Sequence, residues 1–156
     1  MFRVIDIPWW YYLISLVIAT VMWKCWRWEG GLLAGYVFLI LAYTLLTRQS
    51  FVGKHLQLVF LWSWKEWKAQ RNQIITNILM FIPVGIFAEK LWKWRGIVIG
   101  IGLSCMIEAL QYLTARGLCE YDDVLHNSLG ALIGVVIVML IRLITGKKKV
   151  NGNQRT

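Results

Sequence analysis

Polar side chains of the kinds that do chemistry gather in one short stretch of this sequence, RGLCEYDDVLHNSLG at residues 116–130. The stretch ends where the chain turns almost wholly apolar, up to Ile141. Polar groups placed at the mouth of an apolar segment are costly and suggest function. The titratable or charged members are Arg116, Glu120, Asp122, Asp123 and His126, followed directly by Asn127.

Metal binding is one chemistry that these residues could perform. Oxygen ligands from Glu120, Asp122 and Asp123, with the imidazole of His126, suit a hard divalent cation. The sequence contains no HExxH, EF-hand or aspartate-rich repeat, and its cysteines show no paired spacing. A P-loop, a G-x-S-x-G and a dinucleotide fingerprint are also missing. We therefore predict no bound metal and no cofactor.

The elements that must position these residues are membrane helices. Hydrophobic residues make up 58% of the chain and charged residues 16%, whereas a soluble domain is about half apolar and a quarter charged. All 10 tryptophans lie at segment ends or in loops, as amphipathic rings do at the headgroup level. The sequence predicts one all-α polytopic membrane domain with about five spans, at residues 9–26, 31–47, 73–92, 96–115 and 124–141.

The long loop between the second and third spans predicts an interfacial helix. Its apolar centre is too short to span a bilayer, and basic residues alternate with apolar ones at helical spacing. We expect an amphipathic helix over about 54–70, with Lys65, Lys68 and Arg71 toward lipid headgroups. A plain loop packed on the bundle is the alternative.

Charge favours a membrane surface as partner and weakly sets the orientation. The net charge is +9, but the basic residues stand beside spans, so anionic headgroups are expected partners rather than nucleic acid. With five spans and the N-terminus outside, ten of the 17 Lys and Arg residues lie inside, including the basic tail 142–156. The sequence thus favours the plasma membrane of a cell with N-out and C-in.

An alternating path brings polar residues from three spans to one membrane surface. Asn77 lies near the start of the third span, Glu108 and Gln111 share a face near the end of the fourth, and Asp123 and Asn127 share a face at the start of the fifth. We predict that they line a shallow polar cavity. Structural roles stay open for some: Asp122 and Asp123 as helix caps, Glu108 paired with Arg116 or His126, and Pro83 as a kink.

Small residues indicate where the spans pack. Gly96, Gly100 and Ser104 recur every four residues above Glu108, and Gly130 and Gly134 form a GxxxG below Asn127. Such stripes allow close approach of helix backbones in lipid, so they predict helix contacts within the chain or between copies in a homo-oligomer.

These segments together resemble the VanZ-like family of small bacterial membrane proteins. The resemblance covers roughly residues 73–140, in three separated segments that agree in order. It extends the predicted site to Arg116 and Asp122 and marks Phe81, Pro83, Gly85 and Gly130 as a structural motif, to which the GxxxG pattern adds Gly134. Carried over, the family's pattern falls on Asn77, Phe81, Pro83, Gly85, Glu108, Gln111, Arg116, Asp122, Asp123, Asn127 and Gly130.

The resemblance implies reduced susceptibility to glycopeptide antibiotics, teicoplanin and lipoglycopeptides in particular. We expect a non-enzymatic envelope protein that binds membrane lipids, lipid-linked wall precursors or the lipoglycopeptide at the polar cavity. The alternative is an intramembrane enzyme acting on a lipid-phosphate substrate with Glu108 as general base. A transporter is a third option, but no inverted repeat is evident.

Overall fold

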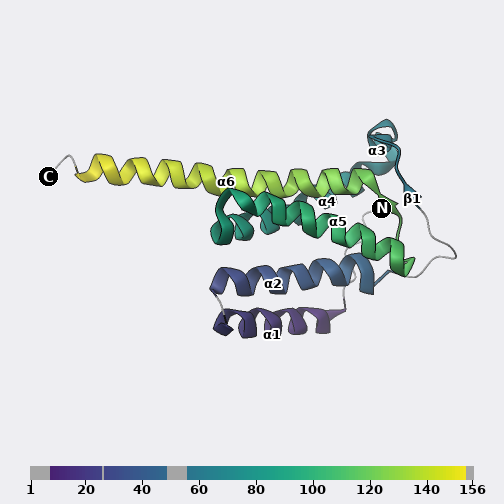
Figure 1. Cartoon of the computed structure of the whole chain (residues 1–156), viewed down its shortest axis with the longest axis horizontal. Helices are drawn as coiled ribbons and strands as arrows, with labels where there is room; N and C mark the ends of the chain where they lie inside the picture. The colour runs from purple at the N-terminus through teal and green to yellow at the C-terminus, as the bar shows by residue number, and fades with distance from the viewer. Residues whose placement is uncertain (1–7, 26, 49–55, 154–156) are drawn as a thin grey trace.

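The computed structural model describes residues 8–25, 27–48 and 56–153, with side chains described as far as Thr145. Almost all of this chain is helical (Figure 1). Short elements join the long ones: η1 (Ala42–Leu46) extends α2, η2 (Lys93–Arg95) links α4 to α5, and strands β1 (Leu56–Gln57) and β2 (Cys119–Glu120) pair in parallel. The α-helices are α1 (Trp9–Cys25), α2 (Trp28–Leu41), α3 (Trp62–Lys65), α4 (Trp67–Trp92), α5 (Gly96–Thr114) and α6 (Tyr121–Asn153).

The long helices lie side by side and alternate in direction (Figure 1). The chain reverses at Lys93, with φ 60°, and at Ala115, with φ 51°, each a left-handed position that ends a helix. As a result the ends of α2 and α5 and the starts of α4 and α6 meet at one end of the bundle. The β1 strand and α3 lie at the same end, on the right of Figure 1.

Three helical stretches are long and apolar enough to cross a membrane: residues 28–46, 67–114 and 121–145. The stretch 67–114 contains both α4 and α5, which the reversal at Lys93 separates. Helix α1 is apolar but has 17 residues and is shorter than the other three stretches. The predicted all-α class is confirmed, and the exact count of five spans stays a prediction.

Glycines set the close approach between α4 and α6. A Cβ on Gly85 would meet the backbone of Ala131, and one on Gly134 would lie 2.8 Å from the Ile86 nitrogen. Phe81, fully buried, lies on the same face of α4 beside Gly130. Small residues let backbones pack this closely, as the stripes in the sequence predict. Pro83 lies inside α4, which continues past it to Trp92.

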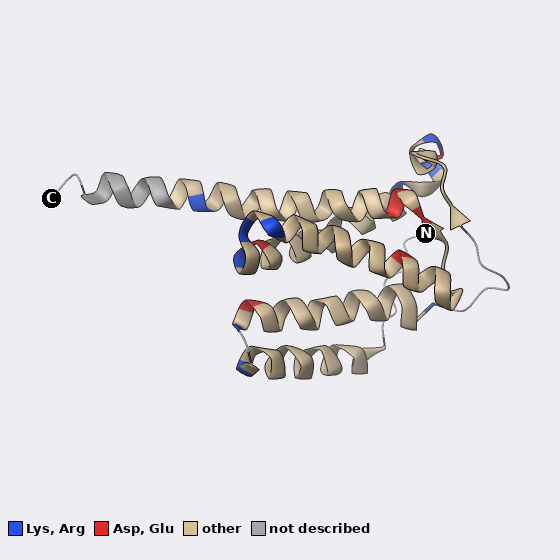
Figure 2. Ribbon diagram, viewed as in Figure 1, with Lys and Arg blue, Asp and Glu red and all other residues tan. Residues whose placement is uncertain are grey.

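An ion pair between the buried Glu89 and the half-exposed Arg142 joins α6 to α4 at the other end of the bundle. The carboxylate of Glu89, 0% exposed, receives the guanidinium of Arg142 with N–O distances of 2.8 and 2.9 Å. The contact to Oε2 is a charge-assisted hydrogen bond, whereas Glu89 Oε1 lies within ion-pair distance without a hydrogen bond. Figure 2 shows basic residues gathered at the same end, around the turn between α4 and α5. Past Arg142 the backbone of α6 stays helical to Asn153, so most of the predicted basic tail 142–156 continues this helix.

The predicted interfacial helix over 54–70 is wrong as a single element. Residues 54 and 55 lie outside the described residues, 56–57 form β1, and only Trp62–Lys65 form α3 before α4 begins at Trp67. The reason is that Leu61 has a left-handed conformation, with φ 56°, and backbone groups of this segment bind to β2 and to α6. Long-range partners therefore replace the local helical hydrogen bonds.

Candidate functional site

Asp122 holds the α3 segment onto the start of α6. Its Oδ1 accepts a hydrogen bond from the Leu61 N–H at 2.8 Å, and its Oδ2 accepts from the N–H and hydroxyl of Ser63 at 2.9 and 2.6 Å. The side chain is fully buried. Asp122 therefore satisfies the free N–H groups at the start of α3, a capping role across 59 residues of chain or more.

His126 makes a second contact with the same segment. Its Nε2 accepts a hydrogen bond from the indole N–H of Trp64 at 3.0 Å, so in the neutral ring Nδ1 carries the proton. That Nδ1 is buried without a hydrogen-bond partner, 4.0 Å from Asp123 Oδ1. Trp64 also stacks on Trp67, with ring centroids 5.5 Å apart. The imidazole thus links α3 to the carboxylates below it.

A carboxylate cluster, defined here as Glu108, Glu120 and Asp123, lies beneath α3. The Gln73 amide nitrogen of α4 lies 3.3 Å from Glu120 Oε2 and 3.1 and 3.2 Å from the two oxygens of Asp123. Glu108 Oε2 accepts the Glu120 backbone N–H at 2.8 Å. The three side chains are 3–6% exposed. Helices α4, α5 and α6 and strand β2 therefore meet in one buried acidic site.

The negative charge gathered here, together with burial, changes the pKa values of Glu120 and Cys119. Burial, followed by the charge of Asp123, raises the pKa of Glu120 to about 7, against the opposing effects of the Gln73 hydrogen bond and the Arg48 charge. Burial and the neighbouring carboxylates of Glu108 and Asp123 also raise the pKa of the Cys119 thiol. The raised pKa values mean that this buried site favours the protonated, uncharged forms of these two groups.

Carboxamides surround the cluster and are incompletely hydrogen-bonded. Asn127 donates to the Ser104 hydroxyl at 2.9 Å, but its Oδ1 is buried with no partner. Gln111 Oε1 and Asn77 Nδ2 are likewise buried and unpartnered. These three side chains are 2–9% exposed. Buried polar atoms without partners are rare in native proteins and call for a specific explanation, such as an absent ligand or water.

Arg116 does not join the carboxylates. Its guanidinium donates to the Leu45 carbonyl at 3.3 Å, at the end of η1, so the structure brings it to neither Glu108 nor His126. Arg48 lies nearer to the cluster, since its charge acts on Glu120. Gly117, with φ 117°, makes room for it: a Cβ there would lie 2.7 Å from Arg48 Nη1 and 3.1 Å from Gln111 Oε1.

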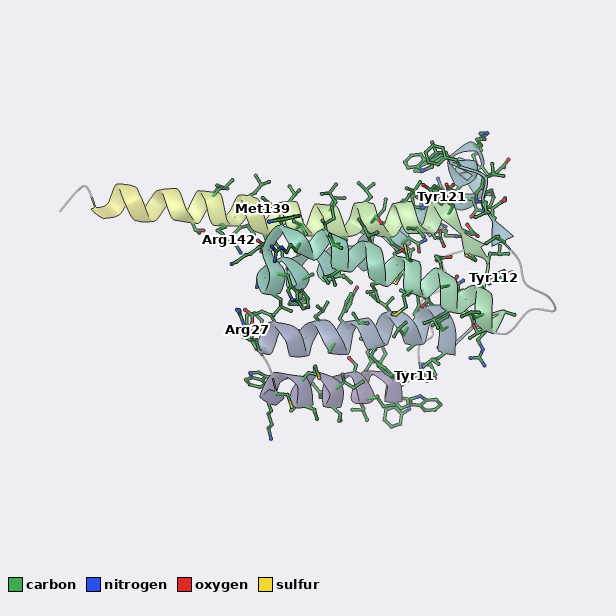
Figure 3. The ribbon with its side chains drawn as sticks, viewed as in Figure 1. Tyr11, Arg27, Tyr112, Tyr121, Met139 and Arg142 are labelled. Carbon is green, nitrogen blue, oxygen red and sulfur yellow. The ribbon has the colours of Figure 1, made fainter. Side chains whose placement is uncertain are left out.

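The predicted headgroup-binding residues lie at the rim of this end. Lys65, Lys68 and Arg71 are exposed on α3 and the first turns of α4. Exposed aromatic rings accompany them, among them Trp64 and Trp67. Figure 3 shows Tyr121 at the same end, and Arg27 and Arg142 at the opposite end. A basic and aromatic rim of this kind suits a headgroup region.

No group of three or more His, Cys, Asp or Glu side chains in the described part of the chain is arranged to hold a metal ion. The four residues considered for metal binding are divided between two tasks: Asp122 and His126 bind Ser63 and Trp64 of α3, and Glu120 and Asp123 share Gln73. Glu108, the candidate general base, has one oxygen engaged by the Glu120 N–H. The geometry therefore gives no particular support to the enzymatic alternative.

The structure brings four of the predicted site residues together at one end of the bundle, with Asn77 buried nearby on α4: Glu108, Gln111, Asp123 and Asn127. The two others have different contacts, since Asp122 binds α3 and Arg116 binds the Leu45 carbonyl. Sequence reasoning missed Gln73, Ser63, Trp64 and Arg48. Gln73 had a usable signal, since it stands four residues before Asn77 and so on the same helical face. The others bind through tertiary contacts that no local pattern marks.

Comparison with known proteins gives one match. A family model described as VanZ/LLP1 matches residues 9–142, which is most of the chain and includes every residue of the carboxylate cluster. No curated protein and no solved structure matches the chain. The match confirms the family resemblance carried by the sequence motifs.

Proposed function

The chain belongs to the VanZ/LLP1 family, and from this membership and the geometry of its polar end we propose a binding protein of the bacterial envelope. It resides in the plasma membrane and lowers susceptibility to teicoplanin-type glycopeptides and lipoglycopeptides. It binds a lipid headgroup, a lipid-linked wall precursor or the drug through the buried polar site. The family resemblance supplies the class of antibiotic, and the site supplies the manner of action.

The observation that carries this proposal is the set of unpartnered polar atoms beside the carboxylate cluster. Gln111 Oε1, Asn127 Oδ1 and Asn77 Nδ2 are all buried without a hydrogen-bond partner. Each such group costs about 1–3 kcal/mol if it stays unpaired. A bound polar ligand recovers this free energy, which a purely structural cluster does not.

The surroundings support a ligand that arrives from the membrane. Lys65, Lys68 and Arg71 stand exposed at the rim, where they reach phosphate groups of lipids. Apolar side chains are exposed below them along α4, among them Ile75 and Leu79, as lipid contact requires. A molecule with a lipid tail and a polar head fits both surfaces at once.

Orientation follows from the same proposal. The polar end lies at the start of α1, and the positive-inside bias favours an outside N-terminus by ten basic residues to seven. The site then faces the leaflet where wall precursors are used and where the antibiotic acts. The C-terminus lies in the cytoplasm.

Asp123→Asn tests the proposal, since the substitution keeps the shape of the side chain and removes its charge. We expect ligand binding to weaken by about tenfold, because hydrogen bonds to charged groups contribute about 1.5–3 kcal/mol. Cells that express the variant should lose most of the increase in teicoplanin minimum inhibitory concentration conferred by the wild type.

Glu66→Gln is the matched control, because Glu66 is an exposed carboxylate at the same end that makes no capping hydrogen bond. It should protect as well as the wild type. Immunoblots of membranes establish that the variants reach equal abundance. Full protection by Asp123→Asn at wild-type abundance would refute a role of this site in resistance.

A further inference from the structure

We propose that the carboxylate cluster receives the primary ammonium group of a membrane lipid, with ethanolamine phospholipids as the simplest ligands. The inference rests on the proposed function and deepens it, because it names the chemical group that the site takes. It is carried by two independent observations: an excess of acceptors within the cluster, and unpartnered acceptors on the faces that lead to it.

The first observation is the imbalance of charge and hydrogen bonds. Among the described residues, no Lys or Arg forms a direct ion pair with Glu108, Glu120 or Asp123, and the one basic side chain within ion-pair distance is His126, whose Nδ1 lies 4.0 Å from Asp123 Oδ1. Arg48 acts on Glu120 through its charge alone. Buried carboxylates are normally paired or hydrogen-bonded throughout, because their desolvation costs several kcal/mol. A cation in this site supplies what the protein's own side chains do not.

The position for such a cation is already occupied by a neutral donor. The Gln73 amide nitrogen lies between Glu120 and Asp123, 3.1–3.3 Å from three carboxylate oxygens. An amide nitrogen has two N–H groups for these three oxygens, whereas a primary ammonium has three and carries a full positive charge. The amide therefore marks where an ammonium nitrogen would sit once Gln73 moves aside.

The second observation concerns buried acceptors outside the carboxylates. Gln111 Oε1 lies one helical turn from Glu108 on α5, and Asn127 Oδ1 lies one turn from Asp123 on α6. Both atoms are buried, both lack a partner, and their side chains are 2% and 3% exposed. These acceptors lie on the two faces that also carry the carboxylates, so they suit a ligand with N–H groups, and two unpartnered donors at the same end, Asn77 Nδ2 and His126 Nδ1, suit its oxygen atoms.

The rim identifies the ammonium as part of a lipid headgroup. Lys65 is exposed on α3, which Asp122 holds through Leu61 and Ser63, and Lys68 is exposed on the first turn of α4. In an ethanolamine phospholipid the ammonium and the phosphate are joined by a two-carbon link, so an acidic site beneath a basic rim matches both charges. A purely anionic headgroup would satisfy the rim and be repelled by the cluster.

The test measures apparent dissociation constants of single lipids by native mass spectrometry of the full-length chain purified in detergent. The probes are dioleoylphosphatidylethanolamine and dioleoylphosphatidylcholine, which carry the same charge and differ in the N–H groups of the ammonium. We expect the ethanolamine lipid to bind at least about tenfold more tightly, since each charge-assisted hydrogen bond is worth that much or more. Free phosphoethanolamine, added as a competitor, shows whether a soluble amine can take the place of the lipid.

Variants connect the preference to the site. Glu120→Gln combined with Asp123→Asn should abolish the preference for ethanolamine, and Glu66→Gln should retain it. Gln73→Ala vacates the position between the carboxylates and should tighten binding of the ethanolamine lipid, a gain that partial unfolding cannot mimic. Equal binding of the two lipids by the wild type would overturn the ammonium assignment, as would a preference that survives in the double variant.

Failure of this inference differs from failure of the proposed function. If both lipids bind equally and the double variant loses both, the polar site binds lipid but does not select an ammonium. If no lipid responds to the double variant and Asp123→Asn still protects cells, the site has no binding role and both proposals fall. Competition by phosphoethanolamine at the affinity of the lipid would support the ammonium and assign it to a soluble source.

Discussion

Asp122 and Asp123 are neighbours in the chain with different structural tasks. Asp122 accepts three hydrogen bonds from Leu61 and Ser63 and is shielded by α3. Asp123, on the next position of the helix, shares the amide of Gln73 with Glu120. Consecutive helical residues point about 100° apart, so one carboxylate holds the α3 segment while the other faces the cluster beneath it.

Asp122→Ala should release the α3 segment without altering the carboxylate cluster directly. The substitution leaves two backbone N–H groups and a hydroxyl without their acceptor, at a cost of about 2–4 kcal/mol for the local contact. Trypsin should then cleave after Lys65 faster in the detergent-purified protein, as measured by the rate of fragment appearance on gels. The cleavage rate of Asp122→Asn, which keeps one acceptor oxygen, should lie between those of the wild type and Asp122→Ala.

Asp123→Asn is the control for this effect, because Asp123 makes no hydrogen bond to α3. Its cleavage rate after Lys65 should equal that of the wild type. Equal rates in Asp122→Ala and in the wild type would mean that other contacts, such as the Trp64–His126 hydrogen bond, suffice to hold the segment.

At the level of single residues, the sequence predicted which side chains lie near one another but not which partner each of them binds. Helical spacing placed Glu108 with Gln111 and Asp123 with Asn127, and the structure brings these faces together. The capping of α3 by Asp122 joins residues about 60 positions apart, and Arg116 turns to a carbonyl of η1. Such partners depend on tertiary packing, which periodicity does not encode.

Among the helices, the contact between α4 and α6 organises the site. Gly85 on α4 and Gly130 and Gly134 on α6 bring the two backbones so close that a Cβ at any of them would meet the opposite helix. The contact sets the distance between Gln73 on α4 and Asp123 on α6, and so the geometry of the carboxylate cluster. Packing of this kind supplies the association free energy that the hydrophobic effect does not supply within lipid.

Gly134→Ala should therefore destabilise the bundle. The new methyl group would lie against Ile82, Ile86 and Gly85 of α4, at a cost of about 1–3 kcal/mol for overpacking. A lower midpoint of thermal unfolding in detergent, followed by circular dichroism, is the expected result. Gly102→Ala provides the control, because a Cβ at Gly102 meets nothing within 4 Å.

The Gly102→Ala variant should be neutral or slightly more stable than the wild type, since alanine favours a helix over glycine by about 1 kcal/mol. If Gly134→Ala shows the same small gain, the close approach of α4 and α6 does not contribute to stability. A loss in both variants would indicate a general sensitivity of the helices and not a specific contact.

The sequence predicted the long helices and their packing stripes better than the segment that covers the site. Apolar runs of helical length define α2, α4, α5 and α6, because membrane helices satisfy their own backbone groups. In the stretch 56–66, by contrast, β1 pairs with Cys119 and Glu120, and the N–H groups of Leu61 and Ser63 bind Asp122. The spacing of its basic and apolar residues is typical of an amphipathic helix, but only Trp62–Lys65 are helical in this stretch.

At the scale of the whole molecule, the two ends of the bundle differ in chemistry. One end holds the carboxylate cluster and its basic rim, and the other holds the paired charges of Glu89 and Arg142. The ion pair links α4 to α6 and stabilises the fold, and Glu89 Oε1 is also buried without a hydrogen-bond partner. The carboxylate cluster differs in that, among the described residues, none of its three carboxylates has a Lys or Arg partner, so this is the end to which we assign binding.

Charge counting predicts which end faces outward by a small margin. Ten of the 17 basic residues lie inside when the N-terminus is outside, and the remainder include the rim residues Lys65, Lys68 and Arg71. These three residues are exposed at the polar end, where they could contact the lipid headgroups of whichever leaflet this end faces. The proposed access of the site to wall precursors and drug depends on this orientation.

Labelling of intact cells with a membrane-impermeant maleimide tests this dependence most directly. Cys119 is half-buried and the pKa of its thiol is raised by burial and nearby carboxylates, so its reaction is slowed. The neighbouring Leu118 is 41% exposed, and Leu118→Cys in a background with the native cysteines replaced by serine reports on the polar end. A variant that keeps only Cys25, which is exposed, reports on the opposite end.

We predict that Leu118→Cys is labelled in intact cells, whereas Cys25 is labelled only after the membrane is permeabilised. This result would place the carboxylate cluster at the outer leaflet, within reach of lipid-linked wall precursors and of lipoglycopeptides. The reverse pattern, with Cys25 labelled in intact cells and Leu118→Cys protected, would place the cluster at the cytoplasmic face and contradict direct engagement of either ligand outside the cell.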